Sequence, residues 1–418
     1  MPSNHAILAP SASSRWMKCA PSARLEAQTP EKDTPYSIEG TIAHAMAESL
    51  LRKALAEQWR SWPEDFASLF RAAWNEYQER VDSAPAPNLE ALYQEVQQAL
   101  DHGFDPWEML ATVSDYYCKF VYEDYLTVHA KDPEAQLLVE QELKLGEFIP
   151  EGFGSSDAVL LCGKWLCVYD LKYGKGVKVD AAWNTQMMCY ALGALCGPAE
   201  LYDIETVRMT IIQPRLRWVS QWDLLAADIW EWAKAELRPA AVTAYQGMGK
   251  FVPGSHCRFC KVAPRCKALA SYATAINSAP CGDAGLMTDA EIADALRDAV
   301  TLKSWLASLE AYALEKALEG REFPGFKVVE GRSVRQISDP QAAMDELANA
   351  GFDEDYYLKP KELQTITNLE KLLGKKGFQS LLGKYVIKPQ GKPTLVEDDD
   401  PRPVFNSAQS AINDFKDV

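Results

Sequence analysis

The feature of the sequence that most restricts the fold is a pair of apolar runs joined by a short turn. The stretch "GFGSSDAVLLCGKWLCVYDLKYG" reads as two β-strands that meet around Gly163. The second run is apolar along most of its length, which is typical of a strand buried in a sheet. It ends at Asp170, and Lys172 follows two places later. Because unpaired charge is costly beside a buried strand, the fold must supply partners for both groups.

The segments around this hairpin indicate a mixed α/β core. A strand over 135–145 precedes it, in "AQLLVEQELKL". A helix over 181–197, a strand in "ETVRMTIIQPRL" and a long helix over 221–246 follow it. This order of elements predicts a central mixed sheet flanked by helices, of the α/β (α+β) class.

Breaks in the helical pattern and shifts in composition divide the chain into five expected parts. Pro63 and the run "SAPAPN" interrupt one helical stretch, and "VEDDDPRP" opens an acidic tail that we expect to be mobile. The parts are N-terminal helices (1–51), a helical insertion (52–135), the core with a cysteine-rich segment (136–270), a helical or mixed C-terminal domain (271–396) and the tail (397–418).

Helices are expected at both ends of the chain. The first should be capped by Ser13 or Ser14 and carry Cys19, and the next should follow Gly40. Near the other end, we expect a helix over 288–319, a hairpin in "GFKVVEGRSVRQI" and mostly helix over 340–387.

Composition limits the classes of function. The chain has 418 residues, 47% of them hydrophobic, which is enough for a large core. Its ten cysteines are irregularly spaced and no export signal precedes them, so we expect a reducing, cytoplasmic setting. No apolar run is long enough to cross a bilayer, and we expect no membrane partner. The net charge of −16 repels nucleic acid on average, so a DNA-binding function requires a local basic surface.

Two aspartates of the hairpin are candidate metal ligands. In an antiparallel hairpin that turns at Gly163, Asp157 lies roughly opposite Asp170, and carboxylate oxygens are preferred ligands of Mg²⁺ and Mn²⁺. Lys172 shares a face with Asp170, where an amine can hold a water or neutralise charge on a phosphate. On the next helix, Gln186 and Tyr190 are one turn apart and can lean over the same edge. The alternative for the Asp-Lys pair is a surface ion pair at a strand end.

Four short motifs occur in a meaningful order. They are "GTIAHAMAE" with His44, "GSSDAVL" with Asp157, "YDLK" with Asp170 and Lys172, and the Q-x-x-x-Y pair of Gln186 and Tyr190. In this order the chain resembles the PD-(D/E)XK nuclease superfamily, and more closely its RecB-like branch with a four-cysteine iron–sulfur cluster. The run "YGKG" and the proline-rich tail look most like a phage-encoded group within that branch.

The resemblance implies a restriction-endonuclease-like fold around a metal site. One or two Mg²⁺ or Mn²⁺ ions would be bound by His44, Asp157 and Asp170, with the backbone carbonyl of Leu171 as a further ligand. The implied activity is a divalent-metal-dependent deoxyribonuclease. The enzyme would be an exonuclease that processes DNA ends in phage recombination or replication. It would act in the cytoplasm of a bacterial or phage-infected cell. A single-strand annealing or single-strand-binding protein is the candidate partner.

The resemblance also assigns roles to the neighbours of these ligands. Lys172 would position the attacking water, and Gln186 and Tyr190 would steady the site or the scissile strand. Glu48 lies one turn from His44, but glutamate is a strong helix former and we interpret it as a helix-surface residue.

A cysteine triplet indicates a second metal centre. Cys257, Cys260 and Cys266 follow the spacing C-x2-C-x5-C, and thiolates so placed can bind Zn²⁺ or a [4Fe–4S] cluster. The spacing does not choose between the two. The resemblance implies the [4Fe–4S] cluster with Cys19 as the fourth ligand, and Cys281 is the rival for that place. The remaining cysteines, in apolar surroundings, are interpreted as buried thiols.

Local basic segments answer the objection raised by the net charge. Residues 359–392 contain eight lysines against two glutamates, and Lys375 and Lys376 lie in "LLGKKGFQSLLG". Lys175 and Lys178 follow the core strand. Each group is expected to contact DNA phosphates, with a solvated surface as the alternative.

Two other functions remain open. One is a non-catalytic factor that binds DNA ends and keeps the nuclease fold, although such a factor could lose Asp157, Asp170 and Lys172 without harm. The other is a zinc-stabilised scaffold whose acidic cluster is incidental.

Overall fold

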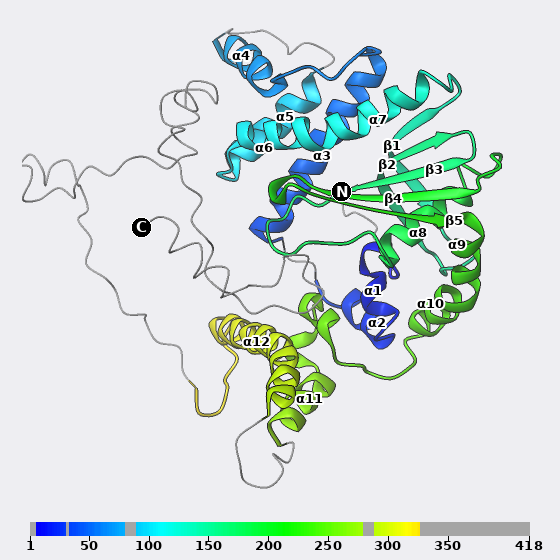
Figure 1. Ribbon diagram of the computed structural model, residues 1–418. Helices are drawn as coiled ribbons and strands as arrows, with labels where there is room; N and C mark the ends of the chain where they lie inside the picture. The colour runs from blue at the N-terminus through cyan, green and yellow to red at the C-terminus, as the bar shows by residue number, and fades with distance from the viewer. Residues whose placement is uncertain (1–5, 31–32, 80–88, 279–287, 327–418) are drawn as a thin grey trace, which may run out of the picture. The chain divides into compact units, whose positions relative to one another are not determined.

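A five-stranded sheet organises the part of the chain that can be described. The computed structural model describes residues 6–30, 33–79, 89–278 and 288–326. The strands are β1 (Gln136–Lys144), β2 (Phe153–Cys162), β3 (Trp165–Leu171), β4 (Thr206–Gln213) and β5 (Trp218–Leu225). They lie in chain order, with β3 and β4 parallel and every other neighbouring pair antiparallel. The predicted α+β class, a mixed sheet flanked by helices, is confirmed (Figure 1).

Helices precede, interrupt and follow the sheet. Before it come α1 (Ser13–Trp16), α2 (Pro21–Ala27), α3 (Pro35–Ala56), α4 (Phe66–Glu79), α5 (Glu90–Asp101), α6 (Pro106–Thr112), the π-helix η2 (Val113–Cys118) and α7 (Lys119–His129). Helix α8 (Thr185–Leu195) connects β3 to β4. After β5 come α9 (Ala226–Trp232), the π-helix η4 (Ala233–Leu237), α10 (Arg238–Tyr245), α11 (Lys267–Ser278) and α12 (Asp289–Leu318). Short 3-10 turns are η1 (Pro10–Ala12), η3 (Pro214–Leu216), η5 (Ser255–Phe259) and η6 (Ala263–Arg265).

Both faces of the sheet are covered by helices (Figure 1). The α3–α7 core, which includes Met46, Val96 and Tyr122, packs on one face. The α8–α10 core, which includes Leu192 and Ile229, packs on the other. Along β3, Tyr169 and Leu171 join the first core while Leu166 and Val168 join the second. Burial on both faces explains why this strand is apolar throughout, up to Asp170.

Local capping fixes the start of the two helices that reach the sheet edge. At α3, Thr34 and Ser37 form a capping box, with Pro35 in the first turn. At α8, the Asn184 side chain accepts hydrogen bonds from the backbone N–H groups of Gln186 (3.1 Å) and Met187 (3.3 Å). The cap therefore holds Gln186 in the first turn of α8.

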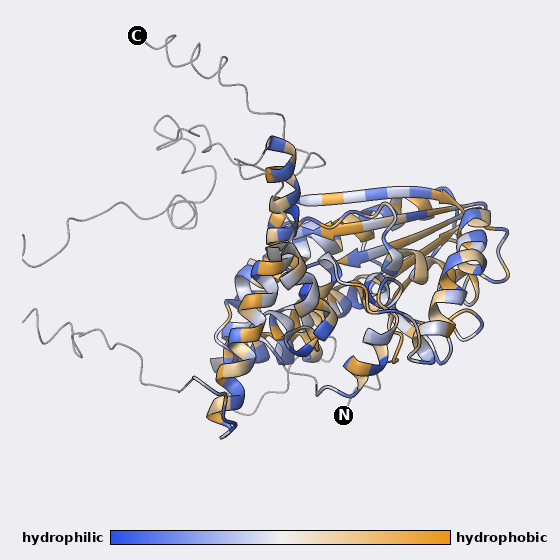
Figure 2. Cartoon of the chain, turned by 90° about the horizontal axis from the view of Figure 1, so that it is seen from below, coloured by the Kyte–Doolittle hydropathy of each residue, from blue (hydrophilic) through white to orange (hydrophobic). Residues whose placement is uncertain are grey.

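The predicted start of the long helix over 221–246 is wrong. Residues 218–225 form β5 instead, and the helix starts at Ala226. Half-buried and exposed residues alternate along β5, which is the period of a strand with one face covered. Figure 2 shows polar and apolar residues interleaved along this edge strand. The alanine- and tryptophan-rich composition concealed this shorter period.

The prediction that Ser13 or Ser14 caps the first helix is also wrong. Helix α1 has no side-chain cap, and the buried Ser13 hydroxyl instead forms a hydrogen bond with the Thr185 hydroxyl (2.7 Å). Because α1 ends at Trp16, Cys19 lies in the turn before α2 and not on a helix. The helix expected to follow Gly40 begins earlier, at Pro35, so Gly40 lies inside α3. The other predicted strands and helices within the described residues are found within a few residues of their expected bounds, including α12, expected over 288–319.

The chain separates into two compact units, Met1–Val328 and Val329–Val418, and the second lies outside the described residues. The hairpin in "GFKVVEGRSVRQI", the helices expected over 340–387, the basic segment with Lys375 and Lys376, and the acidic tail are therefore not described. Among the described helices, none combines the length and apolar character needed to cross a membrane.

Candidate metal centre and cysteine site

Asp157 and Asp170 are neighbours across β2 and β3. The antiparallel ladder pairs Ala158 with Tyr169, and the next step along both strands faces Asp157 with Asp170. The backbone N–H of Leu171 donates to Oδ2 of Asp157 at 2.6 Å, which ties this carboxylate to β3. The Asp170 side chain is only 3% exposed. The hairpin thus brings the two predicted carboxylates together.

Lys172 contacts Asp170 directly. Its Nζ lies 2.8 Å from Oδ2 of Asp170 and donates hydrogen bonds to Oδ1 of Asp170 and Oε1 of Gln186, both at 3.1 Å. Burial alone would lower the pKa of Lys172, but the charges of Asp170 and Asp157 outweigh it and raise that pKa. Lys172 is therefore an ammonium ion at neutral pH, held beside the carboxylates.

The two aspartates differ in their electrostatic surroundings. Burial, reinforced by the charge of Asp157, raises the pKa of Asp170 in spite of Lys172. Burial would also raise the pKa of Asp157, but His44, the Leu171 N–H and Lys172 outweigh it and lower that pKa. Oδ2 of Asp170 is buried without a hydrogen-bond partner among the described residues, because the close Lys172 ammonium does not meet it in hydrogen-bond geometry. This oxygen retains lone pairs that suit a cation.

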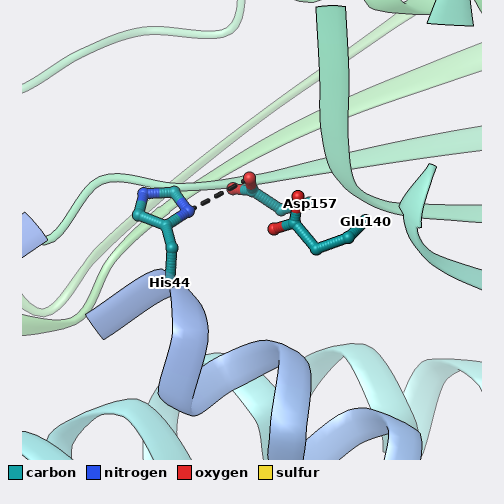
Figure 3. Close-up of side chains that lie close together, drawn as sticks. All are labelled: His44, Glu140 and Asp157. Atoms are coloured by element: carbon teal, nitrogen blue, oxygen red, sulfur yellow. Dashed lines mark hydrogen bonds and ion pairs between the residues drawn. The ribbon is translucent and has the colours of Figure 1, made fainter. Parts of the chain in front are cut away.

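His44 reaches the carboxylates from the opposite helical layer. It projects from α3, and its Nδ1 lies 3.1 Å from Oδ1 of Asp157 (Figure 3). Burial would lower the pKa of His44, but the adjacent Asp157, with Asp170 beyond it, raises that pKa to about 9. The sheet edge thus places a histidine from the α3–α7 side against carboxylates that α8 approaches from the other side.

Gln186 and Tyr190 complete a continuous network with Asp170. The Gln186 Nε2 donates to Oδ1 of Asp170 and to the Tyr190 hydroxyl, both at 3.1 Å. Tyr190 is 7% exposed and belongs to the α8–α10 core. The two helical residues therefore lean over the same sheet edge, as their spacing predicted.

Glu140 was missed by the sequence analysis. Its carboxylate lies beside His44 and Asp157, and the ligand atoms of these three residues are all within 4.8 Å of one another (Figure 3). Ser155 Oγ donates to its Oε2 at 2.8 Å. In the sequence Glu140 sits in a run of alternating polar residues, "VEQELK", which reads as a solvent-facing edge. Only the register of β1 against β2 identifies it.

Glu48 lies on the surface of α3. It forms an ion pair with Arg52 at 2.8 Å, one turn further along α3, and both side chains are well exposed. The interpretation of Glu48 as a helix-surface residue agrees with this geometry.

The four predicted cysteine ligands line one cavity. Cys19 comes from the turn between α1 and α2, Cys257 and Cys260 from η5 and its end, and Cys266 from the residue after η6. Burial raises the pKa of Cys257, and it raises that of Cys260 to about 12. The rival ligand, Cys281, lies outside the described residues.

The cysteine sulfurs are more widely spaced than the ligand atoms of His44, Glu140 and Asp157. Among the described histidine, cysteine and acidic residues, only His44, Glu140 and Asp157 place three ligand atoms all within 4.8 Å of one another. No three of the cysteine sulfurs are that close.

Glu26 joins the N-terminal helices to the cysteine segment. Its carboxylate accepts hydrogen bonds from Arg15 Nε at 2.8 Å and from the backbone N–H of Lys261 at 2.7 Å. Lys261 follows Cys260 directly, so this carboxylate holds the two halves of the cysteine site together.

Comparison with known protein families identifies the family to which the chain belongs. A family model described as "Protein of unknown function (DUF2800)" matches residues 5–403. The chain belongs to the DUF2800 family. A solved structure titled "Crystal structure of SSO0001" is 14% identical and covers 48% of this chain and 94% of its own, with a TM-score of 0.22. At that score the likeness supports no statement about the DUF2800 chain.

The loop between β3 and α8 carries the two predicted lysines of this DUF2800 member. Lys175 is exposed, and Lys178 Nζ lies 4.1 Å from the centroid of the Trp218 ring, a cation–π contact. Gln213 holds the loop by accepting a hydrogen bond from the Val179 N–H (2.7 Å). Both cations thus lie on the segment that follows Lys172.

Proposed function

We propose that the chain is a divalent-metal-dependent deoxyribonuclease that hydrolyses phosphodiesters with metal-activated water. The observation that carries the proposal is the convergence of His44, Asp157 and Asp170 at one sheet edge, with the Lys172 ammonium beside them. More specifically, we propose an enzyme of the RecB-like PD-(D/E)XK kind.

The donor set fits Mg²⁺ or Mn²⁺. Carboxylate oxygens suit both ions, and imidazole nitrogen is a common ligand of transition metals. Asp170 offers a buried oxygen without a hydrogen-bond partner among the described residues. Its raised pKa reflects the cost of burying its charge, which Lys172 offsets only in part and a bound cation would offset further. When bound, the ion would polarise the attacking water and the phosphate.

The chain's own residues would orient the reaction. Lys172 is fixed by Asp170 and Gln186, so its ammonium can hold a water or stabilise charge that develops on the phosphate. Gln186 prevents Asp170 from rotating by donating to Oδ1, and Tyr190 in turn accepts from Gln186. Rigid support of this kind is what a positioned nucleophile requires.

We propose a [4Fe–4S] cluster in the cysteine site, because four cysteines line one cavity and four thiolates are the ligand set of such a cluster. Four thiolates also suit Zn²⁺, and iron, sulfide and zinc analysis of the purified protein decides between the two. Such a cluster would bind the turn that carries Cys19 to the segment that follows α10. Its role would be chiefly structural.

The proposed substrate is DNA. Lys175 and Lys178, beside the sheet edge, would contact phosphates, as would Lys375 and Lys376 outside the described residues. The proposed setting is the processing of DNA ends during phage recombination or replication, together with a single-strand annealing or single-strand-binding protein.

The test is digestion of end-labelled linear DNA and closed circular DNA with Mg²⁺ or Mn²⁺. We expect the wild type to degrade the linear DNA, and Asp170→Asn and Lys172→Met to lose this activity by at least about 100-fold. Asp223→Asn is the matched control, because this half-exposed aspartate of β5 pairs only with Arg208 among the described residues and should leave activity unchanged.

Each result has a defined meaning. Cleavage that survives both Asp170→Asn and Lys172→Met would refute the site assignment. Equal cleavage of closed circles would exclude an exonuclease. Tight binding of DNA ends without cleavage, under either metal, would favour the non-catalytic end-binding function.

A further inference from the structure

A groove of about 320 Å³ opens between the π-helix η2, the start of α7 and the turn that joins β4 to β5. Three aromatic rings line it, those of Tyr116, Phe120 and Trp218. The Tyr116 side chain is 39% exposed. The volume lies within the range of small-ligand sites, and partly exposed rings in a groove suit a flat ligand that can stack on them.

The floor of this groove is continuous with the proposed metal site. Ile212, near the end of β4, lines the groove and is paired in the ladder with Leu171, which stands between Asp170 and Lys172. The backbone N–H of Lys172 donates to the Ile212 carbonyl at 2.9 Å. Because neighbouring strands are about 4.8 Å apart, the groove begins one strand away from the Asp-Lys pair. A molecule in the groove would therefore be the neighbour of a phosphate held at the metal site.

The charges that line the groove cancel. Lys119 and Arg217 contribute two positive charges, and Asp115 and Glu123 contribute two negative ones. A lining without net charge gives a phosphate group no advantage, so the charge pattern favours an uncharged occupant.

Two of the aromatic rings carry a cation at their face. The guanidinium carbon of Arg217 lies 5.9 Å from the centroid of the Tyr116 ring, and Lys178 Nζ lies 4.1 Å from that of Trp218. Lys178 belongs to the loop between β3 and α8, outside the lining of the groove. Stacking rings together with cations that can follow a phosphate backbone are the features with which proteins bind single-stranded nucleic acid.

We infer that this groove binds an unpaired base of the DNA strand that is cut, stacked against the rings of Tyr116 and Trp218. A base inside a duplex is already stacked and paired, so the groove can take a base only from an unpaired strand. The inference rests on the proposed nuclease function and deepens it, because it names the substrate as DNA that is single-stranded next to the cleaved phosphate.

Tyr116 is the ring to remove. Trp218 has a second role, since its Nε1 donates to the Val179 carbonyl at 3.3 Å and so supports the loop that follows Lys172. Tyr116→Ala takes a ring from the groove, and Tyr116→Phe keeps the ring and loses only the hydroxyl. Trp165→Ala is the matched control, because this ring is 38% exposed but lies at the start of β3, at the opposite end of the strand from Asp170.

The test is the affinity of the full chain for a single-stranded oligonucleotide that contains 2-aminopurine, and for a blunt duplex, without added divalent ions so that no strand is cut. The fluorescence of 2-aminopurine falls when the base stacks on an aromatic ring. We expect the wild type to bind the single strand more tightly than the duplex and to quench this fluorescence. Tyr116→Ala should weaken single-strand binding by about 5- to 100-fold and leave duplex binding unchanged. Tyr116→Phe and Trp165→Ala should behave like the wild type.

A second variant separates ligand loss from misfolding. Arg217 has a backbone φ of +49°, a conformation that asparagine adopts more readily than most residues, so Arg217→Asn removes the cation without adding strain. We expect this variant to unfold at the wild-type temperature and to bind the single strand more weakly. Single-strand affinity that is unchanged in both Tyr116→Ala and Arg217→Asn, or that falls no more than duplex affinity, would overturn the inference. A wild type that binds no single strand would also overturn it and leave the groove to a protein partner.

The outcomes distinguish this inference from the proposed function. Quenching that is lost in Tyr116→Ala, in a protein that degrades no DNA with Mg²⁺ or Mn²⁺, would refute the nuclease and leave the base-binding groove intact. DNA cleavage by the wild type, with the same KM and the same single-strand affinity in Tyr116→Ala, would overturn the groove and leave the nuclease intact.

Discussion

Gln186 donates a hydrogen bond to Oδ1 of Asp170 at 3.1 Å, which joins the first turn of α8 to the end of β3. The same amide accepts from Lys172 Nζ at 3.1 Å. One side chain therefore orients both the acidic and the basic member of the D-x-K motif. Because the Asn184 cap fixes where α8 begins, the position of Gln186 is set by the local sequence.

Gln186→Ala should lower the rate of DNA cleavage at saturating Mn²⁺ by about 10–100-fold, the usual effect of removing a residue that orients metal ligands. The number of Mn²⁺ ions bound should not change, since Gln186 is not a ligand in this account. Steady-state cleavage and Mn²⁺ calorimetry measure the two effects. Gln221→Ala, an exposed glutamine of β5, should change neither. Loss of Mn²⁺ binding in Gln186→Ala would contradict the assigned role.

Cys257→Ser should remove the metal group of the cysteine site. We expect the purified variant to lose iron, acid-labile sulfide and its broad visible absorption, and to unfold at lower temperature, because the group links distant parts of the chain. Cys196→Ser is the control, because Cys196 is the C-cap residue of α8 and does not line the cysteine cavity. A colourless wild type that contains zinc would refute the iron–sulfur cluster.

Glu26→Ala should weaken the same site without removing a ligand. It deletes the acceptor for both Arg15 and the Lys261 N–H, and each charge-assisted hydrogen bond contributes about 1.5–3 kcal/mol. We expect faster loss of visible absorption in the presence of a chelator. Glu26→Gln keeps an acceptor oxygen but loses the charge, and its rate should lie between those of the alanine variant and the wild type. Equal rates in all three proteins would show that Glu26 does not support the site.

Glu95 should make stability depend on pH. It is 8% exposed, and burial, opposed in part by the hydrogen bond from Ser49, raises its pKa from 4.5 to about 7. The folded state thus favours the protonated form. Its contribution to stability is complete below about pH 4.5 and is lost as the pH rises through about 7, a decrease on the order of 3 kcal/mol.

Glu95→Gln should abolish this decrease, because the amide cannot ionise. Urea unfolding at pH 5 and pH 8 measures it: the wild type should be clearly less stable at pH 8, and the variant should change less. Glu90→Gln, an exposed glutamate earlier in α5, should behave like the wild type. A wild type with equal stability at both pH values would contradict the raised pKa.

Parts of the site could be predicted from the sequence because they depend on short-range geometry. A tight turn at Gly163 fixes the register of β2 against β3, so Asp157 and Asp170 had to be neighbours. Helical periodicity placed Gln186 and Tyr190 on one face. His44, which is 113 residues from Asp157, was placed only by resemblance to a nuclease family, since no local rule relates α3 to the sheet edge.

The remaining features depend on longer-range packing. Residues 145–152 separate β1 from β2, and a connection of this length leaves the register open, so the sequence could not pair Glu140 with Asp157. The positive φ of Glu140 (+48°) has no sequence signal, because it is imposed by the surrounding sheet. The strand β5 was mistaken for helix because tryptophan and leucine suit both structures, and only pairing with β4 selects the strand.

The central claim is that the cluster of His44, Asp157 and Asp170 holds one or two divalent cations, and anomalous diffraction from crystals soaked in Mn²⁺ tests it most directly. We expect an anomalous peak within about 2.0–2.6 Å of an oxygen of Asp157, with His44 or Asp170 as a further ligand. The Lys172 ammonium should remain beside Asp170 without occupying the peak. Strong Mn²⁺ peaks elsewhere, with none between these three side chains, would contradict the account.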